Sequence, residues 1–258
     1  MSEPAVAIEL QGLCKAFHEQ PVLRGVDLRV REGETFTILG GSGTGKSVCL
    51  KHMLGLLRPD SGTVCLFGRD VTDFSEDRFV EVRKDFGMVF QGSALFDSLS
   101  VFENVAYPLR EHLDLGREEL ARRVGACLAA VGLPDVGGLL PAELSGGMRK
   151  RVGVARAIAL EPRAILYDEP TTGLDPANAR RIGELIRDLQ QRLGVTSVVV
   201  THDMDLCFAV SDRVALLKGG VIVIEGGARE IRRSSHPDVR AFLEGIQDEG
   251  PGEETDGS

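Results

Sequence analysis

The amino-acid sequence predicts an α/β fold with a mixed, mainly parallel central sheet, an antiparallel β subdomain and an inserted helical subdomain. Beyond Ser145, helical segments alternate with continuous apolar runs, the pattern of βαβ units whose strands are buried on both faces. Residues 5–40 instead hold short strand-like runs, and residues 101–133 are mostly helical in pattern. We therefore expect one domain over residues 5–246, with the helical subdomain at about residues 92–160 within it.

The elements before the helical subdomain are predicted in chain order. The runs "VAIEL", "VDLRV" and "TFTILG" are separated by polar turns and indicate an antiparallel edge that leads into a central strand. A helix is expected from Lys46 to about Leu57, where "RPDSG" ends it. A strand "GTVCLF", a helix "SEDRFVEVRKD" and a short strand "FGMVF" follow.

The C-terminal half is predicted to alternate helices and strands. A helix after Ser145 is followed by the strand "AILYD", the helix "ANARRIGELIRDLQQRL", the strand "TSVVVT" and the short helix "DMDLCFAV". Residues 247–258 contain five acidic residues and no basic one, so we expect this acidic tail to be disordered.

Composition and charge limit the possible functions. The chain has 258 residues, of which 43% are hydrophobic and 27% charged, as in a folded globular protein with a sizeable core. The acidic tail accounts for five units of the net charge of −9, and the mildly acidic remainder argues against nucleic-acid binding through a basic surface. Five scattered cysteines without a C-x-x-C pair favour a reducing compartment. We expect a cytosolic chain without a signal peptide or membrane span.

The segment "GGSGTGKS", Gly40 to Ser47, matches the phosphate-binding loop G-x-x-x-x-G-K-[ST] between an apolar strand and a helix. Glycines let backbone N–H groups converge on phosphate oxygens, and the helix N-terminus adds a favourable field. Lys46 would reach the β- and γ-phosphates, and the Ser47 hydroxyl would bind Mg²⁺. The predicted nucleotide contacts are Gly40, Gly41, Ser42, Gly43, Thr44, Gly45, Lys46, Ser47 and Val48.

Polar side chains follow three of the predicted strands. Asp168 and Glu169 end "AILYDE": the first is expected to serve Mg²⁺, and the second to accept a proton from the water that attacks the γ-phosphate. His202 follows "VVVT" and is expected to contact the γ-phosphate and hold the attacking water, although a lone histidine is more often structural. Gln91 follows "GMVF" and could bind Mg²⁺ or water. Acidic residues after strands also occur as ordinary helix caps.

The order of the phosphate loop, "LSGGM", "ILYDEP", "GLD" and "THD" resembles that of the ATP-binding subunits of ABC transporters, over about residues 6–245. The resemblance implies a P-loop ATPase that works with ATP and Mg²⁺ as a head-to-tail dimer. In that arrangement Ser145, Gly146 and Gly147 of one copy would cap the γ-phosphate bound by the other copy, since a helix N-terminus favours anions.

The same resemblance assigns further positions. Phe17 matches the aromatic residue that stacks on adenine, Gln91 the glutamine that links the nucleotide to the transmembrane partner, and Asp175 in "GLDP" the aspartate that acts across the dimer. Met148 departs from the commonest pattern, which has glutamine there. Because the preceding Ser-Gly-Gly makes the phosphate contacts, we expect ATP use to survive this change.

Within that family, "SGGMRKRVGVARAIALEPRAILYDEPTTGLDP" and "GSALFDSLSVFENVAYPLREH" are similar to the ATPases of Mla- and Mce-type lipid transport. This similarity implies a peripheral position at the cytoplasmic face of the inner membrane, with a multispanning permease and a lipid-binding Mce-domain subunit as partners. The permease is expected to dock on an apolar surface segment that contains Leu95, Phe96, Leu99, Val101 and Phe102.

Three alternatives remain open at the level of the sequence. The chain could serve another branch of ABC importer, such as one for amino acids or ions, because the same ATPase core would suit it. A non-transport ABC ATPase usually carries coiled-coil insertions, zinc modules or two cassettes, which this sequence lacks. A P-loop kinase would leave "LSGGM" unexplained.

Overall fold

The computed structural model describes residues 5–244, and its central feature is a six-stranded sheet in the order β10-β9-β3-β8-β7-β6. Neighbours from β9 to β6 are parallel, and β10 is antiparallel to β9. The mixed, mainly parallel sheet predicted from the sequence is therefore confirmed. The strands are β3 (Thr35–Leu39), β6 (Phe86–Val89), β7 (Ala164–Asp168), β8 (Thr196–Thr201), β9 (Arg213–Lys218) and β10 (Val221–Gly227).

The central sheet is buried on both faces, as its continuous apolar strands require. Along β7, Leu166 packs into a core shared with the antiparallel β subdomain, whereas its neighbour Tyr167 packs into a second core shared with the helices. In β8, Val198 and Val199 divide in the same way. Successive side chains of a strand point to opposite faces, so one strand contributes to two cores.

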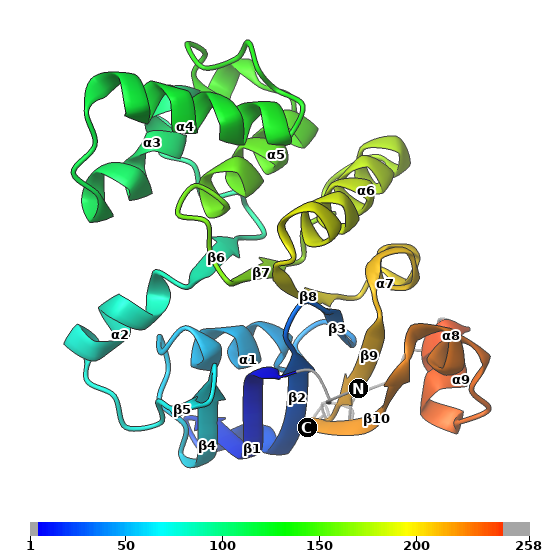
Figure 1. The fold of residues 1–258 in the computed structure, drawn as a ribbon. Coiled ribbons are helices and arrows are strands. Elements are labelled where there is room, and N and C mark those ends of the chain that lie inside the picture. The colour runs from blue at the N-terminus through cyan, green and yellow to red at the C-terminus, as the bar shows by residue number, and fades with distance from the viewer. Residues whose placement is uncertain (1–4, 245–258) are drawn as a thin grey trace, which may run out of the picture.

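A second, antiparallel sheet has the order β2-β1-β4-β5 and lies at the lower left in Figure 1. Its long strands, β1 (Val6–Phe17) and β2 (Gln20–Arg31), extend well beyond the predicted runs because they stay paired with each other from end to end. A turn at His18 and Glu19, both with positive φ, connects them. The shorter strands are β4 (Ser61–Leu66) and β5 (Arg69–Asp70).

Helix α1 (Lys46–Met53) follows the phosphate loop and ends four residues before the predicted end at Leu57. The chain turns at Gly55, which has a φ of 63° and lies against the Phe79 ring, where a Cβ would be 2.4 Å from ring atoms. Only glycine fits this position, so the helix prediction was wrong beyond Met53. Phe79 belongs to α2 (Glu76–Arg83).

The helices inserted between β6 and β7 form a separate layer, drawn in green at the top of Figure 1. The predicted helical stretch 101–133 is divided into two helices, because the backbone becomes extended at Leu113. The layer contains α3 (Val101–His112), α4 (Arg117–Ala130), the 3₁₀ turn η1 (Pro141–Glu143) and α5 (Gly146–Ala157). Its apolar residues form one core with β7, β8 and α6.

The C-terminal part contains elements that the sequence analysis left unassigned. The predicted helices after β7 and β8 are present as α6 (Pro176–Leu193) and α7 (Met204–Val210). The strands β9 and β10, α8 (Ala228–Arg233) and α9 (Pro237–Leu243) were not predicted. The predicted acidic tail lies outside the described residues. Among residues 5–244, no helix combines the length and apolar character that a membrane crossing needs.

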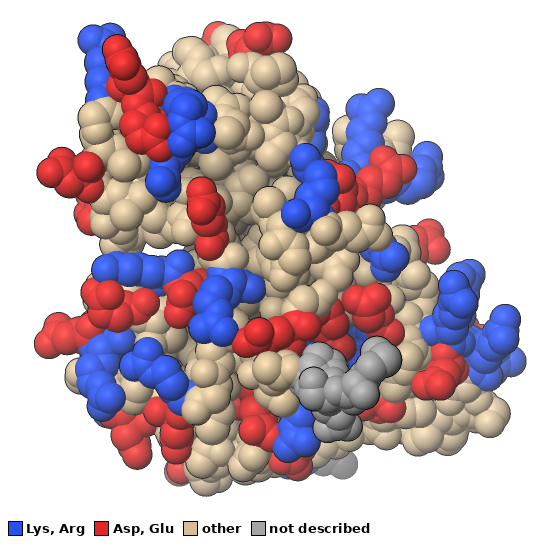
Figure 2. Space-filling model, viewed as in Figure 1, with Lys and Arg blue, Asp and Glu red and all other residues tan. Residues whose placement is uncertain are grey.

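Charge is unevenly distributed on the face shown in Figure 2. Acidic and basic side chains are closely mixed over the lower half, where the two sheets lie, while the helical layer shows a broad area of uncharged residues between charged edges.

Candidate functional site

Three strand ends of the central sheet lie level with one another and position the site. Leu39 at the end of β3 pairs with Thr201 at the end of β8, and Asp168 at the end of β7 pairs with Val200. The phosphate loop, Glu169 and His202 follow directly on these strands. The carboxyl edge of a parallel sheet is the usual ligand-binding edge, and here the order of the strands brings together residues far apart in the sequence.

The phosphate loop is pressed against its neighbours. A Cβ on Gly40 would be 2.5 Å from the carbonyl oxygen of Leu217, and one on Gly45 would be 2.8 Å from the Leu23 side chain. Gly45 also has a φ of 102° and caps the N-terminus of α1. Side chains are therefore excluded at both positions, and the loop keeps its backbone close to the helix N-terminus.

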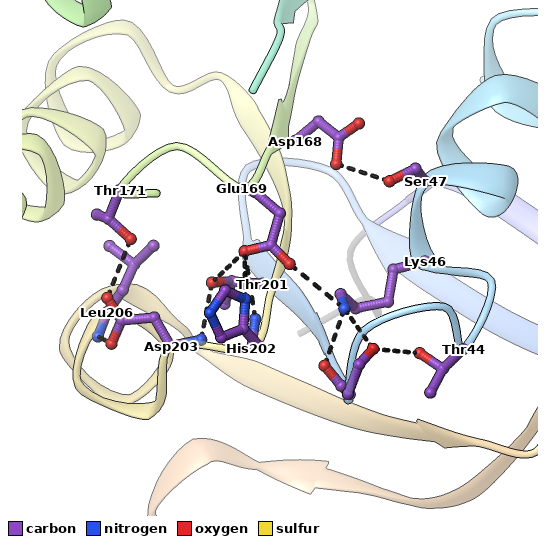
Figure 3. A network of polar contacts seen from close by, with 12 residues as sticks. Thr44, Lys46, Ser47, Asp168, Glu169, Thr171, Thr201, His202, Asp203 and Leu206 are labelled. Atoms are coloured by element: carbon purple, nitrogen blue, oxygen red, sulfur yellow. Dashed lines mark hydrogen bonds and ion pairs between the residues drawn. The ribbon is translucent and has the colours of Figure 1, made fainter. Parts of the chain in front are cut away.

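Lys46, the first residue of α1, is only 6% exposed. Its Nζ donates hydrogen bonds of 2.8 Å to the carbonyl oxygens of both Gly40 and Gly41 and lies 3.3 Å from Oε1 of Glu169 (Figure 3). A buried ammonium needs such partners because its desolvation is unfavourable. The lysine side chain therefore points into the space between the loop and the carboxylate.

Glu169 lies at the centre of the polar cluster in Figure 3 and is buried. Its Oε2 accepts hydrogen bonds from Thr201 Oγ1 at 3.2 Å and His202 N at 3.4 Å and lies 2.9 Å from His202 Nδ1. Its φ of 46° is rare for a residue with a side chain, and such backbone strain is concentrated at functional sites. The backbone N–H of Glu169 donates to Val200 O at 2.9 Å, which helps to hold this conformation.

Ser47 and Asp168 form a pair of oxygen ligands beside the cluster. Ser47 Oγ donates to Asp168 Oδ1 at 2.8 Å. Burial raises the pKa of Asp168, and the Ser47 hydrogen bond only partly opposes this. A cation would stabilise the ionised carboxylate, and Mg²⁺ prefers hard oxygen ligands of this kind. Within residues 5–244 no group of three His, Cys, Asp or Glu residues could hold a metal ion.

Residues of the "LSGGM" and "GLD" segments lie at helix starts in other parts of the fold. Ser145 is exposed and caps α5, where its Oγ accepts from Met148 N at 3.3 Å. Gly147 lies so close to Asn178 that a Cβ would be 2.8 Å from Asn178 Oδ1. Asp175 caps α6 with hydrogen bonds of 3.0 Å from the backbone N–H groups of residues 177 and 178, which lower its pKa.

Two further predicted residues are exposed. Phe17 is 39% exposed at the end of β1, with the Lys15 ammonium 5.7 Å from the centroid of its ring. Gln91 is exposed just after β6, and its backbone carbonyl accepts a hydrogen bond from Lys150. The structure therefore brings Lys46, Glu169 and His202 together, and it leaves Phe17 and Gln91 at the surface.

The predicted docking segment is partly buried. Phe96 is 44% exposed and its ring contacts that of Tyr107 in a tilted arrangement, with centroids 5.0 Å apart and an interplanar angle of 45°, whereas Leu95 and Phe102 pack partly into the helical core. Leu99 is half-buried. Val101 is fully buried in the first turn of α3, so its placement in a surface patch was wrong.

Sequence analysis missed two groups that complete the cluster. Thr201 bonds to Glu169 and also accepts from Asp203 N at 3.0 Å, while Thr171 Oγ1 donates to Asp203 Oδ2 at 3.0 Å. Thr201 precedes His202 at a strand end, which was a usable signal. Thr171 follows the "DEP" segment without a comparable pattern.

A phosphate loop facing a buried glutamate and a histidine at the edge of a parallel sheet defines the class of phosphate-loop ATPases. Residues 23–172 match the sequence profile of the ABC transporter family. The chain is 42% identical over 227 residues to the intermembrane phospholipid transport system ATP-binding protein MlaF of Escherichia coli K12, covering 88% of this chain and 84% of MlaF. It is 41% identical over 240 residues to the probable ribonucleotide transport ATP-binding protein mkl of Mycobacterium tuberculosis H37Rv, covering 93% and 67%.

A solved dimeric ATP-binding cassette in a post-hydrolysis state, bound to ADP and phosphate, superposes with a TM-score of 0.79 at 34% identity, covering 86% of this chain and 99% of that one. This chain belongs to the ABC transporter family. It is the ATP-binding subunit of a transporter and an ATPase, which confirms the fold and the activity expected from the sequence.

Proposed function

We propose that this ATPase powers phospholipid transport at the cytoplasmic face of a membrane, together with a permease and a lipid-binding Mce-domain subunit. The observation that carries the proposal is the 42% identity to a phospholipid transport ATPase over 84% of that protein's length. Relatives of similar identity carry other names: ribonucleotide transport for mkl, and Fe(3+) import for FbpC 1 of Rhizobium meliloti at 44% over 62% of its length. The transported substrate is therefore what an experiment must decide.

In the proposed reaction, Glu169 accepts a proton from the water that attacks the γ-phosphate. The hydrogen bond from Thr201 and the close contact with His202 keep its carboxylate oriented, and His202, with a side chain that is 53% exposed, is free to reach the phosphate as well. Lys46 neutralises phosphate charge, for which the carbonyls of Gly40 and Gly41 are weaker partners. Ser47 and Asp168 would hold Mg²⁺, which supplies positive charge beside the phosphates, and Gln91 is the third proposed ligand.

The nucleotide site is completed by a second copy of the chain. Ser145, an exposed residue, and Gly146 and Gly147 lie at the N-terminus of α5, where the helix field favours an anion. We place the γ-phosphate of the partner's ATP against this turn, and Asp175 at the boundary between the two copies. Phe17, exposed at the end of β1, provides a surface on which adenine can stack. The solved dimeric cassette supports pairing of two such chains.

The permease is proposed to dock on Phe96 and its surroundings. Phe96 and Tyr107 present two half-exposed rings that contact each other in a tilted arrangement. The buried Asn104 fixes this segment: its Oδ1 accepts from Phe96 N at 2.8 Å and its Nδ2 donates to the carbonyls of Phe96 and Leu99 at 3.1 Å. A rigid aromatic pair at the edge of the helical layer is the kind of anchor that dominates interface energies. Leu95, Leu99 and Phe102 flank it.

Docking is tested with Phe96→Asp, which places a charge on the exposed ring. We expect the variant to fold and bind ATP but to lose co-purification with the permease. Leu193→Asp at the end of α6, where Leu193 is 57% exposed and distant in sequence from the docking segment, is the matched control and should still co-purify. A lowered melting temperature for Phe96→Asp alone would place Phe96 in the core, and a folded variant that still assembles would contradict the docking site.

The substrate is tested on the complex purified through a tag on this chain and reconstituted into vesicles. ATP-dependent transfer is measured in parallel for a fluorescent phospholipid, a radiolabelled ribonucleotide and ⁵⁵Fe(3+). We expect transfer of the phospholipid alone, and none with Glu169→Gln. Transfer of the ribonucleotide or of iron would overturn the lipid proposal and leave the ATPase assignment intact.

A further inference from the structure

Lys150 is a buried lysine in the middle of α5, five residues after Ser145, and is only 6% exposed. Its Nζ donates hydrogen bonds to the backbone carbonyl of Gln91 and, at 3.4 Å, to the backbone carbonyl of Glu169. One side chain of the helical layer therefore contacts both of the loops that follow β6 and β7. Burying an ammonium is unfavourable unless its donors are paired, so a lysine here requires these carbonyls.

The register of the sheet explains why one amine can reach both carbonyls. Strands β6 and β7 are parallel, and the last pair between them joins Val89 to Tyr167. Gln91 and Glu169 each lie two residues beyond that pair, where the strands diverge into separate loops. Lys150 donates hydrogen bonds to both segments where they diverge. It replaces the missing strand-to-strand contact with a bridge from α5.

The segment after Gln91 is also held by α5, but through a different residue. Arg156 donates to the carbonyls of Ala94 at 2.7 Å and Ser93 at 2.9 Å. Ser93 and Ala94 both have positive φ, so this turn is strained and depends on such contacts. Arg156 is thus bound to the same segment as Lys150, but its hydrogen bonds go to Ser93 and Ala94 and not to Glu169. The two cations form a natural pair for comparison.

We propose that Lys150 is a positioning residue of the ATPase reaction, which fixes the peptide of Glu169 against the Gln91 turn and so ties the catalytic carboxylate to the helical layer. This inference rests on the proposed role of Glu169 as proton acceptor. Glu169 has a strained backbone, and a bond to its own carbonyl restrains the conformation that aims its side chain at the site.

The test compares steady-state ATP hydrolysis by the full-length chain with Lys150→Met, Lys150→Gln and Arg156→Met. Lys150→Met keeps the length of the side chain but cannot donate, and we expect kcat to fall about tenfold to a hundredfold, since small displacements of a reacting group have effects of that order. KM for ATP should change little. Lys150→Gln, whose amide can donate, should recover part of kcat. Arg156→Met loosens the segment and should leave kcat close to that of the wild-type protein.

A thermal melt and nucleotide binding accompany each variant. If Lys150 has only a structural role, Lys150→Met and Arg156→Met should lower kcat and the melting temperature in parallel. That result would overturn the proposal. If Lys150→Met does not fold, the kcat-to-KM split of Lys150→Gln decides: an unchanged kcat contradicts the role, and a lowered kcat at unchanged KM supports it. Glu169→Gln is run alongside. Wild-type turnover in that variant would remove the proposed base itself, whereas an inactive Glu169→Gln with a normal Lys150→Met would remove only Lys150.

Discussion

The residues around Glu169 and those at the starts of α5 and α6 differ in how far one chain completes them. Glu169 contacts both Lys46 and His202 directly, and the three residues belong to segments that follow three neighbouring strands. Ser145 and Asp175 contact only their own helices among the bonds described, and both are exposed. The first group is arranged by the sheet, whereas we propose that the second joins a site only when a second copy of the chain covers it.

This contrast also divides the chemistry. Deprotonating water and neutralising phosphate charge need groups with controlled distances, which a buried sheet edge provides. Binding the opposite side of a phosphate needs an exposed helix N-terminus. Such an N-terminus needs no further arrangement within its own chain before it can bind the anion. Under the proposed pairing of two copies, one chain would bind the nucleotide and the Ser145 turn of the other would complete the site.

The largest effect is expected from Glu169→Gln, which removes the proton acceptor while it keeps the size of the side chain. Hydrolysis should fall by about 10²–10⁴-fold, with ATP still bound and the dimer held closed. Single-turnover hydrolysis and ATP-dependent dimerisation measure the two parts. Glu184→Gln, on the exposed face of α6, is the matched control and should be unaffected. Normal turnover in Glu169→Gln would contradict the role given to the cluster around Glu169, because that cluster would then contain no proton acceptor for the attacking water.

A smaller effect tests whether the exposed group works in the other copy. Lys46→Ala and Ser145→Arg chains should each be inactive alone. When they are mixed, each heterodimer has one site with both lesions and one with neither. If one intact site turns over, mixing should restore up to about a quarter of wild-type activity, since random pairing makes about half of the dimers mixed.

The control for that experiment carries both lesions in one chain. Lys46→Ala/Ser145→Arg mixed with wild-type chains places one lesion in each site of the heterodimer, so it should reduce activity below that of simple dilution. If Ser145 instead acts within its own chain, the first mixture should stay inactive and the second should show simple dilution, about half of wild-type activity, because each wild-type chain then keeps an intact site.

The sequence predicted the strand-end residues well because their positions follow from local patterns. An apolar run that ends in Asp168 and Glu169, or in His202, is readable without knowledge of its neighbours, and the parallel arrangement then brings the ends together. The phosphate loop is equally local: its glycines and Lys46 are required by the backbone conformation and by phosphate chemistry.

Other features depend on contacts between distant residues and could not be predicted in the same way. The end of α1 is set by the Phe79 ring packed against Gly55, and the burial of Val101 is set by the helical core around it. Lys150 reads as part of a positive run in "MRKRV", yet it is buried between two backbone carbonyls. Pattern alone gives the charge of such a residue but not its environment.

The smallest effect concerns Asp175, where a local role and a role across the dimer can be separated. Its Oδ1 caps α6, and the aspartate is followed by Pro176 at the first helical position. Asp175→Ala removes the cap and should lower the melting temperature by about 2–4 °C. Asp175→Asn keeps the cap, because asparagine is an equally good N-cap, and should melt like the wild-type protein.

If the charge acts across the dimer, Asp175→Asn should still weaken ATP-dependent dimerisation, measured by size-exclusion chromatography in the Glu169→Gln background. Dimerisation that is lost only with Asp175→Ala would show that Asp175 acts only as a helix cap. The Ser145 turn would then be the single exposed group proposed to act across the dimer.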